Sequence, residues 1–310
     1  MAEGSPAAIR LDSVVKRYGA HDVVRDVSFE VPAGQLVALV GHNGAGKTTL
    51  MKLMLGLTRP NAGEIRIEGA DPAGPAAVTL RRAIGYLPEN VAFQGAMTGR
   101  ELLTFYARLK DQPAASCGDL LDTVGLTESA DRPVRTYSKG MRQRLGLAQA
   151  LLGQPRLLFF DEPTSGLDPS ARLRFYDLLT RLRASGATVL VSSHALTEIE
   201  ARADRIAIMK TGRLVALGAL EALRQEADLP VRMTLSVQPG QAAAVADRIG
   251  AAADLRKVNE TVVDLNCLGR DKMEIVRRIS DLGETVRDVE IAPPNLEQIY
   301  AHFTGDARPQ

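Results

Sequence analysis

Residues 36–48, Leu-Val-Ala-Leu-Val-Gly-His-Asn-Gly-Ala-Gly-Lys-Thr, decide the fold, because an apolar run passes directly into a glycine-rich loop that ends in Lys47 and Thr48. The loop fits the pattern G-x-x-x-x-G-K-[ST], in which the glycines let successive backbone N–H groups point at phosphates. In this pattern the lysine reaches the β- and γ-phosphates and the next hydroxyl binds magnesium. The predicted nucleotide contacts here are Gly41, Asn43, Gly44, Ala45, Gly46, Lys47, Thr48 and Thr49.

A second apolar run, residues 157–160, ends in two adjacent carboxylates, Asp161 and Glu162. Continuous apolar runs of this kind are typical of strands that are buried on both faces of a sheet. Such a strand is expected to deliver one acid to a magnesium ion and the other to an attacking water. Asp161 and Glu162 are therefore the candidates for these two roles.

Residues 137–143, Tyr-Ser-Lys-Gly-Met-Arg-Gln, place a hydroxyl and a glycine where a helix is expected to begin. The free backbone N–H groups of a helix start form an anion site. The chain already has one phosphate-binding loop, so a second anion site suggests a site shared between two chains. Ser138 and Gly140 of one copy would then close the nucleotide site of the other, which predicts a homodimer.

In the order of these motifs, over roughly residues 8–220, the chain resembles the ATP-binding subunits of ATP-binding-cassette (ABC) transporters. The resemblance implies ATP and magnesium as cofactors, a homodimer around two ATP molecules, and separate transmembrane permease subunits as partners. It implies that Asp161 holds magnesium, directly or through water, and that Glu162 is the general base. It further implies that Tyr18 stacks on adenine and that His194 contacts the γ-phosphate and holds the hydrolytic water. It also implies that residues 165–168, ending in Asp168, contribute to the nucleotide interface and communicate between the two sites.

Two positions depart from the family pattern. Glu89 stands where most cassettes carry glutamine; its carboxylate can still bind magnesium through oxygen, but it cannot donate an amide hydrogen bond. Lys139 lies inside the helix-opening signature, where it either adds positive charge near the partner's phosphates or is solvated as most lysines are. We predict Glu89 as a magnesium ligand and leave both interpretations of Lys139 open.

The alternation of strand-like and helix-like runs, together with the resemblance, predicts an α/β fold. We expect a P-loop ABC nucleotide-binding domain at residues 8–220, with an antiparallel β subdomain and a helical insert at about 90–150. A smaller α+β domain is expected at residues 228–305, where the order β-α-β-β-α-β matches a ferredoxin-like unit. Its role is either dimerisation or regulation, or simple structural support. Within the insert, which in this family grips the membrane subunits, Phe105 belongs either to the core, which is the favoured expectation, or to that interface.

Composition limits the class of partner. The chain has 38 Lys plus Arg and 37 Asp plus Glu, and a formal charge of +1 provides no overall basic field, so we predict no nucleic acid partner. No apolar run approaches the roughly 18 residues of a membrane span, and the first residues lack the order of a signal peptide. With the resemblance, this predicts the cytoplasmic face of the inner (plasma) membrane, with attachment through the permease.

The resemblance implies ATP hydrolysis coupled to transport by an exporter. A cytosolic cassette ATPase of translation or chromosome maintenance and a soluble regulatory ABC ATPase are the alternatives of another class. Three segments also resemble the ATPase subunit of the exporter for copper-site assembly in nitrous oxide reductase. They are Gly-His-Asn-Gly-Ala-Gly-Lys, Leu-Pro-Glu-Asn and Tyr-Ser-Lys-Gly-Met. That version predicts copper or sulfur-species export and a periplasmic maturation protein as a candidate partner. ATPase subunits of drug, antibiotic or lipid exporters share most of these residues and remain the alternative.

Overall fold

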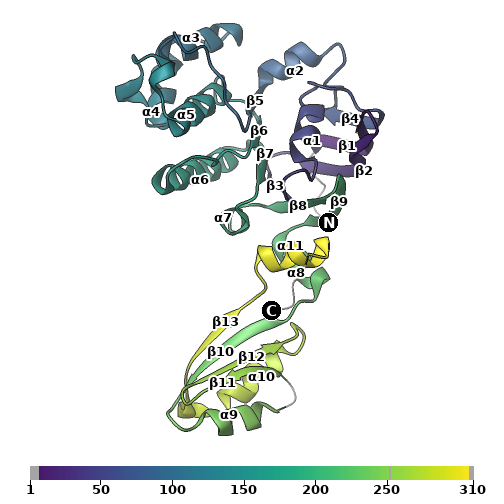
Figure 1. The fold of residues 1–310 in the computed structure, drawn as a ribbon, viewed down its shortest axis with the longest axis vertical. Helices are drawn as coiled ribbons and strands as arrows, with labels where there is room; N and C mark the ends of the chain where they lie inside the picture. Colours follow the sequence, from purple (N-terminus) through teal and green to yellow (C-terminus); the bar gives the residue numbers. More distant parts are fainter. Residues whose placement is uncertain (1–6, 251–252, 307–310) are drawn as a thin grey trace. The chain divides into compact units, whose positions relative to one another are not determined.

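A computed structural model of the chain describes residues 7–250 and 253–306. The chain divides into two compact units, Met1–Leu217 and Gly218–Gln310, which are described separately here (Figure 1).

The first unit is built on a six-stranded sheet in the order β5-β6-β7-β3-β8-β9. The pairs β5–β6, β6–β7, β7–β3 and β3–β8 are all parallel. Its strands are β3 (Leu36–Val40), β5 (Ile84–Leu87), β6 (Leu157–Asp161), β7 (Thr188–Ser193), β8 (Arg205–Lys210) and β9 (Arg213–Gly218). Every residue of β3, β6 and β7 is buried, as expected for parallel strands that are covered on both faces. The two predicted apolar runs, residues 36–40 and 157–160, are therefore confirmed as central strands.

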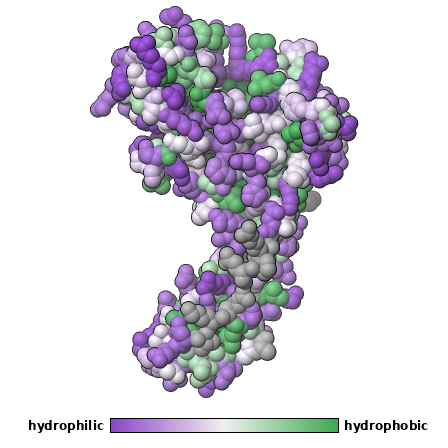
Figure 2. Space-filling view, viewed as in Figure 1, coloured by the Kyte–Doolittle hydropathy of each residue, from purple (hydrophilic) through white to green (hydrophobic). Residues whose placement is uncertain are grey.

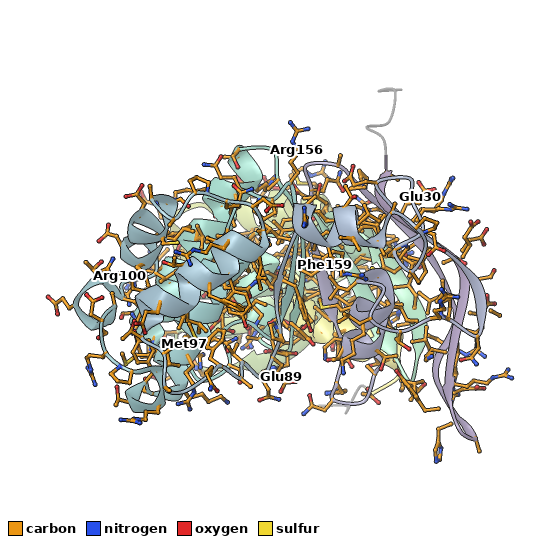
Figure 3. All side chains as sticks on the ribbon, turned by 90° about the horizontal axis from the view of Figure 1, so that it is seen from above. Glu30, Glu89, Met97, Arg100, Arg156 and Phe159 are labelled. Carbon is orange, nitrogen blue, oxygen red and sulfur yellow. The ribbon has the colours of Figure 1, made fainter. Side chains whose placement is uncertain are left out.

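The carboxyl ends of these strands bring part of the predicted site to one edge of the sheet: the glycine-rich loop, Glu89, Asp161, Glu162 and His194. Figure 3 shows Arg156, which directly precedes β6, and Glu89, which follows β5, at opposite edges, with Phe159 between them. The parallel register places Asp161 beside Ser192. The glycine-rich loop, which follows β3, and Glu162 and His194, which follow β6 and β7, leave the sheet at this same edge.

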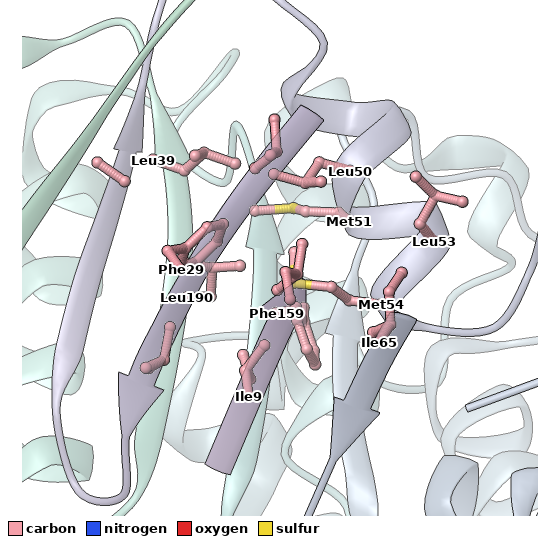
Figure 4. Packing of buried hydrophobic residues seen from close by; sticks show 14 of the residues in the cluster. Ile9, Phe29, Leu39, Leu50, Met51, Leu53, Met54, Ile65, Phe159 and Leu190 are labelled. Atoms are coloured by element: carbon pink, nitrogen blue, oxygen red, sulfur yellow. The ribbon is translucent and has the colours of Figure 1, made fainter. Parts of the chain in front are cut away.

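An antiparallel sheet of three strands, in the order β2-β1-β4, completes the first unit and confirms the predicted antiparallel β subdomain. Its strands are β1 (Ala7–Tyr18), β2 (His21–Pro32) and β4 (Ala62–Ile67). Helix α1 (Lys47–Met54) contributes Met51 and Met54 to a buried cluster with Phe29 of β2 and Phe159 of β6 (Figure 4). Through this core, the helix that begins at Lys47 packs against both sheets.

The other helices of the first unit follow α1 along the chain. They are α2 (Ala77–Ala83), α3 (Gly99–Leu109), α4 (Ser116–Thr123), α5 (Lys139–Ala150), α6 (Pro169–Ala184) and α7 (Leu196–Glu200), with short 3₁₀ turns at Thr127–Ser129 and Val134–Thr136. The expectation that Phe105 belongs to the core is wrong, because its side chain is 47% exposed. Leu102, Leu103 and Ala107 form the buried face of α3, and position 105 falls outside that face.

The second unit contains a four-stranded antiparallel sheet in the order β11-β12-β10-β13. Its elements in chain order are α8 (Leu220–Ala227), β10 (Val231–Val237), α9 (Ala242–Ile249), β11 (Asp254–Val258), β12 (Val262–Cys267), α10 (Lys272–Ser280), a 3₁₀ turn (Gly283–Thr285), β13 (Val286–Ala292) and α11 (Leu296–Thr304). From β10 to β13 this is the β-α-β-β-α-β order of a ferredoxin-like unit. The predicted fold class is confirmed.

On the face drawn in Figure 2, hydrophilic residues dominate and apolar ones are scattered between them. Within residues 7–250 and 253–306, no helix is long and apolar enough to cross a membrane.

Candidate functional site

The glycine-rich loop forms one wall of a pocket of about 250 Å³. Gly46 precedes α1 with φ of 100°, and a Cβ there would lie 2.7 Å from the Val23 carbonyl oxygen, so a glycine is required at this turn. The pocket brings together most of the predicted nucleotide contacts. It is lined by Val23, His42, Asn43, Gly44, Ala45, Gly46, Lys47, Thr48, Thr49, Glu89 and Glu162.

Lys47 is held at the base of this pocket by three oxygen atoms. Its Nζ donates to the Gly41 carbonyl oxygen at 2.6 Å and to the His42 carbonyl oxygen at 3.4 Å, and it lies 3.5 Å from Oε1 of Glu162. Gly41 does not line the pocket itself but orients the ammonium through its bond. Both side chains of the ion pair are at most 10% exposed, so the lysine presents a buried positive charge next to the loop that would hold phosphates.

Glu162 links this lysine to His194. Its Oε2 lies 2.6 Å from Nδ1 of His194. The side chain of His194, which directly follows β7, is 67% exposed. The backbone of Glu162 is in the left-handed region, with φ of 47°. A non-glycine residue in this region costs about 1–3 kcal/mol, and such strain concentrates at functional sites. The strained turn directs the carboxylate toward Lys47 and His194.

Asp161 lies directly before Glu162 and is 1% exposed. Its Oδ1 accepts a hydrogen bond of 2.6 Å from the hydroxyl of Ser192. Its Oδ2 is buried and has no hydrogen-bond partner among the described residues. A buried carboxylate oxygen without a partner fits a cation ligand, and the hydroxyl of Thr48 and the carboxylate of Glu89 in the adjoining pocket are the hard oxygen donors that magnesium prefers.

Tyr86, on β5, lies within the electrostatic influence of Asp161. Burial, followed by the negative charge of Asp161, raises the pKa of Tyr86 to about 12. The phenol therefore stays protonated at neutral pH and adds no further negative charge near the carboxylates.

The helix-opening signature lies against a different segment of its own chain. Ser138 caps α5 by accepting a hydrogen bond from Met141 N, and a Cβ on Gly140 would lie 3.1 Å from the Gly166 carbonyl oxygen. Nζ of Lys139 donates to the Ser165 hydroxyl at 3.4 Å. Lys139 and Gly140 thus lie against residues 165–167, and neither Ser138 nor Gly140 is among the residues that line the pocket of their own chain.

Two further predicted residues also lie apart from that pocket. Asp168 is the N-cap of α6, where its carboxylate accepts from Ala171 N and from the Ser170 hydroxyl, both at 2.8 Å. These hydrogen bonds lower its pKa. Tyr18 ends β1 with a side chain that is 48% exposed, and Nζ of Lys16 lies 5.0 Å from its ring centroid. From the same β subdomain, Val23 of β2 lines the pocket.

Sequence reasoning missed two polar residues that brace the site. Ser192 contacts both Asp161 and Glu162, and the side-chain amide of buried Gln143 donates to the Pro163 carbonyl oxygen at 3.3 Å. Their signal in the sequence is a polar residue within an otherwise apolar strand and a glutamine next to the signature. Neither signal identifies a partner, because the contacts join residues that lie 20 to 31 positions apart.

Comparisons with known proteins identify relatives of the chain. The ABC transporter family profile matches residues 24–165. A daunorubicin resistance ATP-binding protein of Streptomyces coeruleorubidus is 35% identical over 97% of this chain and 97% of its own. A Nod factor export ATP-binding protein of Ralstonia nicotianae is 34% identical over 97% of this chain and 95% of its own.

Solved structures give the same result for the first unit. The ATP-binding subunit of an ABC transporter is 33% identical, with a TM-score of 0.67 over 71% of this chain and 92% of its own. A dimeric ATP-binding cassette bound to ADP and Pi has a TM-score of 0.64 over 68% of this chain and 98% of its own. At 24% identity, that second likeness concerns the fold.

Proposed function

The chain belongs to the ABC transporter family as an ATP-binding subunit with ATPase activity, and on this basis we propose that two copies close around two ATP molecules and drive a separate export permease. The proposal rests mainly on the position of the Glu162 carboxylate. It lies between Nζ of Lys47 and Nδ1 of His194, and Glu162 lines the same pocket as the phosphate-binding loop. This geometry suits hydrolysis of the terminal phosphate.

The chemistry follows from positioning and charge. Backbone N–H groups of the loop and the ammonium of Lys47 would bind the phosphates, because transfer of a phosphoryl group to water is catalysed largely by positioning and by neutralising charge. Glu162 would accept the proton of the attacking water, while His194 holds the carboxylate through Nδ1 and contacts the γ-phosphate side. Thr48, Glu89 and Asp161 would hold magnesium, which supplies positive charge to the phosphate oxygens when it is bound.

The arrangement of the signature supports the homodimer. Ser138 and Gly140 contribute nothing to the phosphate pocket of their own chain, yet they open a helix whose N–H groups suit an anion. A second copy would place these groups opposite Lys47 and Glu162, with Asp168 near the interface. We also propose that Tyr18 stacks on the adenine. These contacts lie between copies or with the nucleotide, and they belong to the ATP-bound dimer.

The full-length relatives support export as the direction of transport. Their names refer to daunorubicin resistance and to Nod factor export, and both align over nearly the whole chain, second unit included. We therefore propose an organic small molecule or lipid-like compound as cargo, and attachment to the cytoplasmic face of the inner membrane through the permease. For the second unit we propose dimerisation or regulation.

Export of copper or a sulfur species for nitrous oxide reductase, with a periplasmic maturation protein as partner, is the narrower candidate. It rests on the residues of the loop, of the Leu-Pro-Glu-Asn segment and of the signature. Among the described residues, no three His, Cys, Asp or Glu side chains group as a metal site. In either version the permease, rather than this chain, would select the cargo.

Copurification with native membranes tests the proposal. The tagged chain and its Lys47→Ala variant would be isolated from detergent-solubilised membranes, and partners identified by mass spectrometry. A multispan permease bound to both, with ATP hydrolysis by the wild-type complex alone, is the expected result. A periplasmic maturation protein in the same complex would favour the copper version. Recovery of only a soluble homodimer that hydrolyses ATP would favour a regulatory ATPase outside transport.

A further inference from the structure

Ser192 carries a buried hydroxyl near the carboxyl end of a central strand, after the apolar residues 189–191. All six residues of β7 are buried, and Ser192 is 0% exposed between Val191 and Ser193. A buried hydroxyl is unfavourable unless it is hydrogen-bonded, so its place in a central parallel strand needs a compensating role. The residues around it show what that role is.

The hydroxyl of Ser192 makes two hydrogen bonds to consecutive residues of the neighbouring strand end. It accepts from the backbone N–H of Glu162 at 2.9 Å and donates to Oδ1 of Asp161 at 2.6 Å. The direction of both bonds is fixed, because the amide can only donate and the hydroxyl has one proton to give. The parallel register, with Asp161 beside Ser192, makes this bridge possible.

The two bonds act on the two acids in different ways. The bond to Asp161 occupies Oδ1 and fixes the carboxylate plane, which leaves the buried Oδ2 as the oxygen without a hydrogen bond among the described residues. The bond from Glu162 N–H supports the left-handed backbone that directs its carboxylate toward Lys47 and His194. One hydroxyl thus orients a predicted metal ligand and the predicted base together.

We propose that Ser192 is a positioning residue of the ATPase site, which holds Asp161 for magnesium and Glu162 for proton transfer through a single hydroxyl. The inference rests on the proposed function of this site. Outer partners of metal ligands typically change metal affinity by about 10- to 100-fold when they are removed. Loss of the hydroxyl should therefore weaken metal binding to the ATP-loaded protein while leaving metal-free ATP binding unchanged, because Lys47 and the loop are untouched.

The test compares Ser192→Ala, Ser192→Cys and Ser192→Thr in the full chain. Cysteine fills the space but is a weak donor, whereas threonine keeps the hydroxyl. Thr188→Val is the matched control: it removes a buried hydroxyl from the other end of the same strand, where Thr188 Oγ1 accepts from Gly34 N at 2.9 Å. Thermal unfolding of each variant separates a folding defect from a site defect.

Binding of Mn²⁺ is measured by electron paramagnetic resonance in the Glu162→Gln background, where ATP stays intact, and metal-free ATP binding is measured by fluorescence of an ATP analogue. We expect Ser192→Ala and Ser192→Cys to lose about tenfold or more in Mn²⁺ affinity, and Ser192→Thr and Thr188→Val to remain near the parent value. Normal Mn²⁺ affinity in folded Ser192→Ala would overturn the inference, as would an equal loss in Thr188→Val. Either result leaves the proposed function standing, since that depends on the hydrolysis rates of Lys47→Ala and Glu162→Gln.

Discussion

Oε2 of Glu162 lies 2.6 Å from Nδ1 of His194, although the two residues are 32 positions apart in the chain. They meet because β6 and β7 are neighbouring parallel strands that end at the same edge of the sheet. An ionised carboxylate only accepts hydrogen bonds, so Nδ1 is the donor in this contact. Nε2 then accepts from a water in the neutral ring, and it donates to a phosphate oxygen only when the ring is protonated on both nitrogens. The pair therefore connects the predicted base with the solvent side of the pocket.

Replacement of Glu162 by Gln should remove most ATP turnover without removing ATP binding. The amide keeps the size of the side chain but cannot accept the proton of water, and general base catalysis is typically worth about 10²- to 10⁴-fold. The measurements are the ATPase rate and the elution volume in size-exclusion chromatography with ATP present. We expect the variant to elute as a dimer that persists in ATP. Glu128→Gln, at an exposed 3₁₀ turn, is the control. Full hydrolysis by Glu162→Gln would show that another group is the base.

Replacement of His194 by Ala should lower turnover more than it lowers ATP affinity. The change removes the hydrogen bond that orients Oε2 of Glu162, while Lys47 keeps its own contacts with Gly41 and Glu162. We expect kcat to fall by about 10²-fold, the lower end of the range for groups that assist proton transfer. His302→Ala, on α11 of the second unit, is the matched control. An unchanged kcat would mean that the contact is structural only.

Replacement of Lys47 by Ala should abolish the stabilisation that ATP gives to the folded chain. A ligand at 100 times its dissociation constant stabilises the native state by about 2.7 kcal/mol, and this gain disappears with binding. Lys110→Met is an informative control, because Lys110 is also a partly buried lysine, bonded to the Ile84 and Leu152 carbonyl oxygens away from the pocket. It should lower intrinsic stability but retain the ATP-induced rise in melting temperature. A retained rise in Lys47→Ala would contradict the site.

The sequence predicted those parts of the site that depend on local order. Residues 36–48 and 157–162 each contain a strand and the polar group that follows it, so the strand, the loop and the chemistry could be predicted together. The bridge from Ser192 to Asp161 could not, because it depends on which strands are neighbours and on their register. Phe105 was misplaced for a related reason, since a short helix does not reveal from its sequence which of its faces is covered.

The carboxylate of Asp168 should make the stability of the first unit depend on acidic pH. Its hydrogen bonds with Ala171 N and the Ser170 hydroxyl lower its pKa in the folded state below the unfolded value of about 3.9. This contribution is present above the unfolded pKa and is lost as pH falls through the lower folded pKa.

Asp168→Asn keeps a good N-cap without the titrating group, so its urea midpoint should change less between about pH 5 and pH 2 than that of the wild type. Asp177→Asn, on the exposed side of the same helix, should follow the wild type. Equal pH profiles for Asp168→Asn and the wild type would show that the cap does not contribute through its charge.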